Sequence, residues 1–268
     1  MGRLAMIVRG RAVPYAEAVD RLLWVMDPRR GGAAARATAC LLAAFANGGV
    51  GFAVDPLAVL PTPAPGAVRV FVVRHGEALS NLPHPHTPMA RLDRLTARGH
   101  VEAGAAGKAL EGRGIELVLT SPAGRARETA ADIGRALGNV PLRVEARLEP
   151  LRMGVAPDGH HLSWAERKED WAAGRDPSPP EGESLAQLGG RIGGLLEDAG
   201  EKARHGKGPR TIALVTHSEV VNALVGVIDQ RVPLEATMSG VHNASITVVD
   251  LEADGRAHLV AQDLVPWR

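Results

Sequence analysis

From residue 68 onward, runs of β-branched and other apolar residues alternate with segments in which apolar residues recur at helical spacing. The first run, Val68–Val73, is apolar at nearly every position, which is typical of a strand buried on both faces. Further strands are predicted at 115–119, 142–148, 211–215, 245–251 and 257–264, and helices at 96–110, 121–137, 162–172, 184–203 and 218–228. This alternation predicts an α/β fold, a three-layer α/β/α sandwich with a mostly parallel central sheet.

Local signals mark the ends of several of these elements. Thr96 can cap the helix that follows it. Ser121 followed by Pro122 predicts an N-cap and a proline at the first helical position. Ala253-Asp254-Gly255 predicts a hairpin turn between the last two strands.

The first 66 residues show a different pattern. Apolar residues at helical spacing predict a helix over Tyr15–Met26. The uncharged segment 37–54 has two interpretations, a membrane span or an Ala-rich helix packed on the main domain or in a homodimer contact. The second is favoured because Asn47 and nearby glycines interrupt the segment and alanine contributes little hydrophobic free energy. Prolines between 56 and 65 predict a stiff linker. We therefore predict a helical, Ala/Pro-rich extension of unassigned role at 1–66 and one domain at 67–268.

Composition narrows the function classes. The chain has 268 residues, 45% of them hydrophobic and 23% charged, enough for one large core with a small appendage. The formal net charge of +1 gives no global field for nucleic acid or for an anionic membrane. Eight Phe, Trp and Tyr residues are too few for a base-stacking platform. The single cysteine, Cys40, rules out a disulfide framework within the chain and favours a reducing, cytoplasmic location.

Basic residues follow three of the predicted strands. Arg74 and His75 end the first strand, Arg125 lies one turn into the helix after the second, and His217 follows Thr216. If these strands are neighbours, the four side chains converge at one sheet edge, where open α/β sheets bind ligands. Gathering such cations is costly unless an anion neutralises them, and the Arg fork matches phosphate oxygens. Chance placement on separate loops is the alternative, but the joint pattern favours a phosphate site.

Two further features would support anion binding. The helices predicted to begin at Ser121 and Ser218 would present free N–H groups to the same edge. Gly76, with no Cβ, would let the backbone turn sharply after the first strand.

The ordered motifs resemble the histidine phosphatase superfamily, the branch that includes cofactor-dependent phosphoglycerate mutases and many small phosphatases. The resemblance rests on Val73-Arg74-His75-Gly76-Glu77, on Ser121-Pro122-Ala123-Gly124-Arg125-Ala126 and on Val215-Thr216-His217. It covers about 68–267, and a set of motifs in this order is highly specific. The resemblance implies a phosphoglycerate-mutase-like fold.

The resemblance also implies roles for individual residues. His75 would be the nucleophile that forms a phosphohistidine, its second ring nitrogen held by a backbone carbonyl of the following turn. Arg74, Arg125 and His217 would hold the equatorial phosphate oxygens. No metal and no other cofactor is expected, because the arginines supply the positive charge.

Three more residues have expected roles at this site. Glu149 would protonate the leaving alcohol and then deprotonate the attacking water; the alternative is an exposed glutamate beside Arg147 and Arg152. Asn81 occupies the place of a phosphate-contacting asparagine, and Ser218 is a further candidate phosphate contact.

Softer candidates lie outside these motifs. His84 and His86 are weak as metal ligands and are expected on a loop over the pocket. Residues after Glu149, including His160, His161 and Arg152, would shape the leaving-group site. Trp164 and Trp171, seven apart, either belong to that site or share one buried helix face.

Departures from the family pattern bear on the substrate. Ala78 replaces a usual Ser or Thr, Ser218-Glu219 replaces a common pair of glycines, and the frequent Trp-Glu-Gly after the acid is absent. Only 32 residues, Pro150–Glu181, separate the acid from the Gly-Glu-Ser segment, which is short for a mutase. We therefore expect a phosphatase acting on a small phosphomonoester; the alternatives are a mutase-like phosphotransferase and a non-catalytic phospho-ligand or protein-binding module.

Overall fold

The computed structural model describes residues 5–8, 11–14, 55–83, 88–138, 140–229 and 240–267. The chain divides into two compact units, residues 1–54 with 58–60 and residues 55–57 with 61–268. In the first unit, β1 (Ala5–Val8) and β2 (Arg11–Pro14) pair antiparallel, a strand pair that the sequence pattern did not predict. The predicted helix at 15–26 and the segment 37–54 lie outside the described residues, so the assignment of 1–66 as a helical extension stays a prediction.

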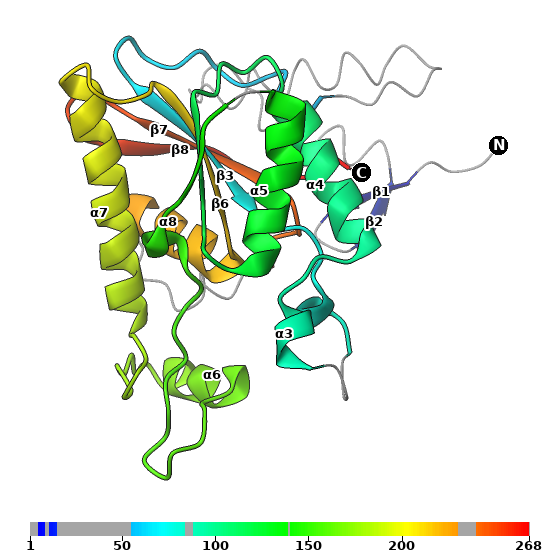
Figure 1. Cartoon of the computed structure of the whole chain (residues 1–268), viewed down its shortest axis with the longest axis vertical. Coiled ribbons are helices and arrows are strands. Elements are labelled where there is room, and N and C mark those ends of the chain that lie inside the picture. The colour runs from blue at the N-terminus through cyan, green and yellow to red at the C-terminus, as the bar shows by residue number, and fades with distance from the viewer. Residues whose placement is uncertain are drawn as a thin grey trace. The chain divides into compact units, whose positions relative to one another are not determined.

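The second unit is built on a six-stranded sheet of order β5-β4-β6-β3-β7-β8 (Figure 1). Its strands are β3 (Val68–Arg74), β4 (Leu117–Thr120), β5 (Leu142–Val144), β6 (Thr211–Thr216), β7 (Ile246–Leu251) and β8 (Ala257–Leu264). The pairings β5–β4, β4–β6 and β6–β3 are parallel, whereas β7 runs antiparallel to both of its neighbours. The mostly parallel sheet predicted from the alternation of elements is therefore confirmed.

Helices cover both faces of the sheet and complete the three layers (Figure 1). Side by side on one face lie α4 (Ala97–Leu110) and α5 (Gly124–Leu137). The other face carries α7 (Leu185–Arg204) and α8 (Ser218–Asp229), which also pack on each other. Shorter helices lie in the connections: η2 (Leu79–Asn81), α3 (Met89–Leu92), η3 (Ala146–Leu148) and α6 (Trp164–Ala172).

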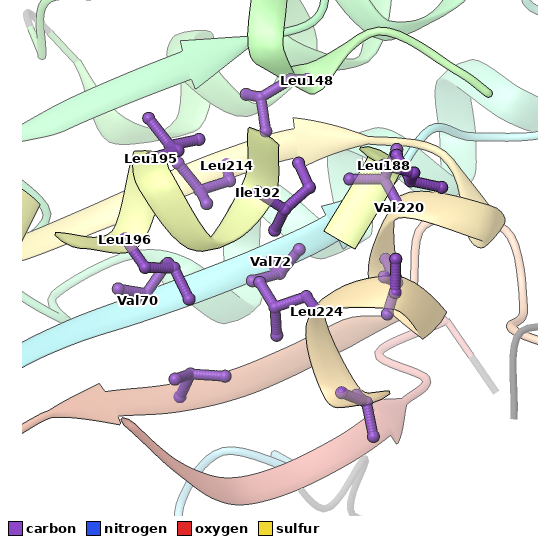
Figure 2. Close-up of a cluster of buried hydrophobic side chains, with 14 of the residues drawn as sticks. Val70, Val72, Leu148, Leu188, Ile192, Leu195, Leu196, Leu214, Val220 and Leu224 are labelled. Carbon is purple, nitrogen blue, oxygen red and sulfur yellow. The ribbon is translucent and has the colours of Figure 1, made fainter. Parts of the chain in front are cut away.

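Successive side chains of β3 point to opposite faces of the sheet, so this strand faces both helical layers. Val68, Val70 and Val72 belong to a core cluster that contains Leu188 and Ile192 of α7 and Leu224 of α8 (Figure 2). Phe71 and Val73, which are also buried, occupy the alternate positions of the strand and therefore face the opposite side. A strand buried on both faces holds its end rigidly, and β3 ends at Arg74.

The predicted Pro-rich linker is docked at one point. Leu57 is fully buried, its backbone N–H donates to the Asp55 carboxylate, and its carbonyl accepts from Arg113. Arg113 also pairs with Asp55. In the described ranges, none of the helices combines the length and the apolar character needed to cross a bilayer.

Several predicted ends move in the structure. Thr96 caps α4 as predicted, its side chain accepting from Gly99 N. The prediction that a helix begins at Ser121-Pro122 is wrong, because α5 begins at Gly124 with Ala123 as N-cap. The strand predicted over 142–148 ends at Val144 and gives way to η3, and that predicted over 115–119 lies at 117–120.

Candidate active site

The carboxyl ends of the three central parallel strands bring the candidate residues together. Arg74 is in register with Thr216 of β6, and Thr120 of β4 is in register with Val215. The backbone continues this pairing past the strands, because His75 N donates to the Thr216 carbonyl at 2.8 Å. The expected convergence of the four basic side chains follows from this strand order.

His75 is held with one ring nitrogen available to react. The side chain is 4% exposed, and its Nδ1 lies 2.8 Å from the Gly76 carbonyl oxygen. Since a carbonyl can only accept, Nδ1 carries the proton and donates it. Nε2 then carries a lone pair, which accepts a hydrogen bond from Arg125 Nε at 3.1 Å. The contact between Nδ1 and the Gly76 carbonyl supports the expectation that a backbone carbonyl of the next turn holds the second ring nitrogen.

Arg125 connects the two imidazoles. Its Nε faces His75, and its second terminal nitrogen donates to His217 Nδ1 at 3.1 Å. Because a guanidinium cannot accept, His217 must carry its proton on Nε2, which lies 2.9 Å from the Ser121 hydroxyl. The two imidazole rings stand edge to face with centroids 5.2 Å apart. One planar cation thus sets the tautomer of both histidines.

Arg74 approaches from the β7 side. One terminal nitrogen donates to the Val241 carbonyl, while the buried Nε has no hydrogen-bond partner within the described residues. Burial lowers the pKa of Arg74 from its ordinary value, and the negative charge of Glu219 opposes that effect. Glu219, one of the family departures, is itself 9% exposed and accepts hydrogen bonds from Leu151 N and the Ser218 hydroxyl.

Burial and positive charge keep both histidines neutral. Desolvation is the largest cause that lowers the pKa of His75 to about 3, and Arg125 and Arg74 lower it further. His217 behaves the same way: burial, then His75 and Arg125, hold its pKa well below the usual range. A neutral imidazole with its lone pair directed at a guanidinium can act as a nucleophile toward an anion bound by that guanidinium.

The turn that carries His75 packs unusually closely on α4. A Cβ added at Gly76 would lie 2.4 Å from the Gly99 carbonyl oxygen, and one added at Gly99 would lie 2.0 Å from the Glu77 carbonyl oxygen. The expected sharp turn at Gly76 is therefore explained by close approach of two backbones, since Gly76 does not have a positive φ. At each of the two positions, any side chain would collide with the backbone of the other segment, so glycine is required at both.

The expected free N–H groups at the helix after the second strand are not available. Gly124 N donates to the Asp93 carboxylate at 2.6 Å, and Arg125 N lies 3.4 Å from the same group. The Ser121 hydroxyl, predicted as a cap of this helix, instead contacts His217 Nε2 and accepts from Ala123 N. At α5 a protein carboxylate takes the place predicted for an external anion.

Further supporting residues were missed by the sequence reasoning. Asn243 donates from Nδ2 to the His75 carbonyl at 3.0 Å, and the adjacent Ala244 N donates to the same oxygen at 3.2 Å. Ala244 has a positive φ of 50°, a strained conformation for a non-glycine residue that is common at functional sites. The Thr129 hydroxyl accepts from Gly76 N at 3.0 Å and donates to the Arg125 carbonyl. A lone Asn or Thr in a single sequence carries no signal for such contacts.

Glu149 lies directly after η3, beside the end of β6. The Thr216 hydroxyl donates to the Leu148 carbonyl at 2.8 Å, and Arg191 donates to the Glu149 carbonyl at 2.9 Å. In the alternative, an exposed glutamate beside Arg147 and Arg152, no ion pair with them is seen in the described residues, because those arginines pair with other carboxylates. Its acid–base role stays a prediction.

The remaining candidates are less directly engaged. The Asn81 side-chain oxygen accepts from Ala78 N at 2.9 Å and from Asn243, so a phosphate contact through its amide nitrogen stays a prediction. The same holds for Ser218, whose hydroxyl donates to Glu219. His84 and His86 lie outside the described residues.

The segment after Glu149 is partly exposed. His160 forms ion pairs with Asp158 and Glu166 at the surface. Trp164 and Trp171 meet edge to face, but Trp164 is 44% exposed whereas Trp171 is buried, so the prediction of one shared buried face holds only for Trp171.

Open α/β sheets bind ligands at the carboxyl ends of their strands, and a guanidinium at that place matches the oxygens of a phosphate. The sequence profile of the histidine phosphatase superfamily (branch 1) matches residues 70–263. The chain belongs to this superfamily.

Similar proteins include both mutases and phosphatases. A probable phosphoglycerate mutase GpmB from Shigella boydii is 30% identical over 190 residues, covering 69% of this chain and 86% of that protein. A 2,3-bisphosphoglycerate-dependent phosphoglycerate mutase from Mesorhizobium japonicum is 31% identical, covering 60% of this chain and 82% of its own. Among solved structures, a mycobacterial glucosyl-3-phosphoglycerate phosphatase complexed with VO3 is 25% identical with a TM-score of 0.57, covering 74% of this chain and 99% of that chain.

Proposed function

We propose that the protein is a phosphomonoesterase that hydrolyses a small phosphorylated metabolite through a phosphohistidine at His75. The observation that carries the proposal is the Arg125 guanidinium, which contacts His75 Nε2 and His217 Nδ1 at 3.1 Å each. A guanidinium beside a nucleophilic nitrogen and a second neutral imidazole is suited to bind the oxygens of a phosphate group. Superfamily membership and the similarity to a phosphatase support this interpretation.

The first chemical step is attack by His75 Nε2 on phosphorus. Nδ1 keeps its proton, which it donates to the Gly76 carbonyl, so the phosphorylated ring is a cation that can later leave as neutral imidazole. For attack, Arg125 Nε must transfer its hydrogen bond from the Nε2 lone pair to a phosphate oxygen. Arg74, Arg125 and His217 then stabilise the equatorial oxygens as negative charge is redistributed.

The alcohol departs with a proton, which we assign to Glu149. The same carboxylate then takes a proton from water as the water attacks the phosphohistidine, releasing inorganic phosphate and neutral His75. The first step leaves Glu149 ionised and the second step protonates it again, so one carboxylate suffices for both.

The second candidate is a mutase-like phosphotransferase, favoured by the names of the similar curated proteins. A bisphosphorylated substrate would need additional positive charge near the site. In the described residues, Arg152 and Arg191 are already paired with Glu183. This pairing and the short segment between Glu149 and the Gly-Glu-Ser segment favour hydrolysis of a monophosphate.

The test compares purified wild type with His75→Ala and with His100→Ala, a histidine on α4 paired with Asp132. Phosphate release is measured with a generic aryl phosphate and with a panel of phosphorylated metabolites. We expect turnover by wild type and His100→Ala and none by His75→Ala. When the reaction with a ³²P-labelled substrate is quenched rapidly without acid, ³²P should remain bound to the wild-type protein and not to His75→Ala.

Each other function gives a different result. Equal turnover by wild type and His75→Ala, or no turnover with any ester, would favour the non-catalytic binding module. Activity found only when 2,3-bisphosphoglycerate is supplied with a monophosphoglycerate would favour the mutase.

A further inference from the structure

Arg125 depends on a carboxylate from a distant part of the chain. Asp93 follows α3, and its Oδ1 lies 2.6 Å from one terminal nitrogen of Arg125. That is the nitrogen which faces neither His75 nor His217. Each of the three guanidinium nitrogens thus makes one contact, two with imidazoles and one with a carboxylate.

The same carboxylate also fixes the backbone beneath Arg125. Asp93 Oδ2 accepts from Gly124 N at 2.6 Å, and Oδ1 lies 3.4 Å from Arg125 N. The side chain and the main chain of Arg125 are therefore fastened to one group. A planar fork bound in this way has few rotamers left, which reduces the entropy lost when it grips an anion.

Gly124 makes this approach possible. A Cβ at position 124 would lie 2.6 Å from the Asp93 carbonyl oxygen and 3.0 Å from Oδ2. Because Gly124 has no positive φ, glycine is needed here for space alone. Asp93 supplies the carboxylate and Gly124 the space for it, so both residues serve to hold Arg125.

We propose that Asp93 is a positioning residue for phosphoryl transfer, which holds Arg125 so that its other two nitrogens face His75 and His217. The proposal rests on the proposed function for its catalytic consequence. Its structural part, the orientation of Arg125, can be measured without any substrate. Asp93 itself does not touch the reacting atoms.

The pair is not offered as a source of stability. The Asp93 side chain is 40% exposed, and an ion pair of that kind contributes little to folding. Asp176 provides a matched control, because its carboxylate accepts from Leu185 N and Ala186 N at the start of α7 and so performs the same capping. Asp176→Ala removes a helix cap, whereas Asp93→Ala removes a cap and the hold on Arg125.

The variants are Asp93→Ala, Asp93→Asn, Gly124→Ala and the control Asp176→Ala. With an aryl phosphate, we expect kcat/KM to fall about 10- to 100-fold in Asp93→Ala, mostly in kcat. Asp93→Asn should lose less kcat/KM than Asp93→Ala. Its amide oxygen can still accept from either Arg125 or Gly124 N, whereas its amide nitrogen cannot accept from the other. Gly124→Ala, which displaces Asp93 without changing its chemistry, should resemble Asp93→Ala, and Asp176→Ala should stay within about twofold of wild type.

Two further measurements separate positioning from a general structural defect. Formate added to Asp93→Ala should restore part of the lost kcat, whereas chloride at the same ionic strength should not. In ¹⁵N NMR, the Arg125 Nε–H signal should be protected from exchange in wild type and in Asp176→Ala and lose that protection in Asp93→Ala.

The outcomes are distinct. Unchanged kcat/KM in Asp93→Ala, or reduced kcat/KM with an unchanged Arg125 signal, overturns the proposal. If no ester is hydrolysed by wild type but the Arg125 signal changes in Asp93→Ala, the proposed function fails and the positioning role stands. Should Asp93→Ala not fold, the near-isosteric Asp93→Asn gives the same comparison.

Discussion

Gly99→Ala tests whether the contact between α4 and the His75 turn sets the geometry of the site. The new methyl group would lie 2.0 Å from the Glu77 carbonyl oxygen, whereas ordinary contact begins near 3.4 Å. Either the His75 turn or the first turn of α4 must therefore move by about 1.4 Å. The Glu77 oxygen belongs to the backbone, so no flexible side-chain end can give way instead. Since a displacement of about 1 Å at a reacting group can cost about 100-fold, we expect kcat/KM to fall by about that factor.

The same helix provides the control. A Cβ at Gly104 would meet nothing within 4 Å, so Gly104→Ala should leave kcat/KM unchanged. It should also raise the free energy of unfolding by about 0.5–1 kcal/mol, because alanine is the better helix former. Overpacking at Gly99 should instead lower it by about 1–3 kcal/mol.

The assay is steady-state hydrolysis of an aryl phosphate beside urea unfolding of the three proteins. If Gly99→Ala keeps kcat/KM within about twofold of Gly104→Ala, the turn does not depend on this backbone contact. A Gly99→Ala protein that loses activity only in proportion to the fraction unfolded would refute the reasoning equally.

Three other changes test the electrostatics and hydrogen bonding of the site. Burial lowers the pKa of His75 to about 3 in the folded protein, against about 6.5 in the unfolded chain, so the unfolded chain binds this proton first as pH falls. The free energy of unfolding should therefore drop below about pH 6.5 by up to about 1.4 kcal/mol per pH unit. In denaturant titrations between about pH 6.5 and about pH 4, His75→Asn should show a shallower drop. Arg125→Lys keeps the charge but cannot contact both imidazoles and Asp93 in one plane, so kcat/KM should fall at least about 10-fold in initial-rate measurements; a full retention of rate would show that charge alone is needed. Ser121→Ala removes the acceptor for His217 Nε2–H, an uncharged hydrogen bond, and should cost about 1 kcal/mol of stability with a smaller loss of activity than Arg125→Lys; the reverse order would assign Ser121 a more direct role.

The sequence could predict the features that depend on strong local pattern. The buried run ending at Arg74 and the β-branched run ending at Thr216 specified two central strands, and the cap at Thr96 specified where α4 begins. Once parallel strands are placed side by side, residues at their carboxyl ends must meet, which is why His75 and His217 could be brought together from sequence.

Features that depend on contacts between distant segments could not be predicted. The proline signal at 122 predicted a helix start, yet tertiary contacts prevailed, since Asp93 reaches Gly124 and Ser121 is used by His217. Asp93 lies between Arg91 and Arg94 in a segment that mixes apolar and charged residues, where nothing in the local pattern distinguishes it from a solvated carboxylate. Asn243 acts from a loop whose position depends on distant segments, namely the pairing of β7 with β3 and the hydrogen bond from Trp267 Nε1 to the Asn243 carbonyl.

The strand order has a consequence for how the chain reaches this arrangement during synthesis. β6 lies between β3 and β4, although it leaves the ribosome long after both of them. Until Thr211–Thr216 has emerged, the facing edges of β3 and β4 have no strand to pair with, and the apolar β3 remains open to misassembly. Insertion of this late central strand should be the slow event of folding, because its partners are distant in sequence. Mutations that weaken β6 should therefore reduce the yield of native protein more than equal destabilisation in α4.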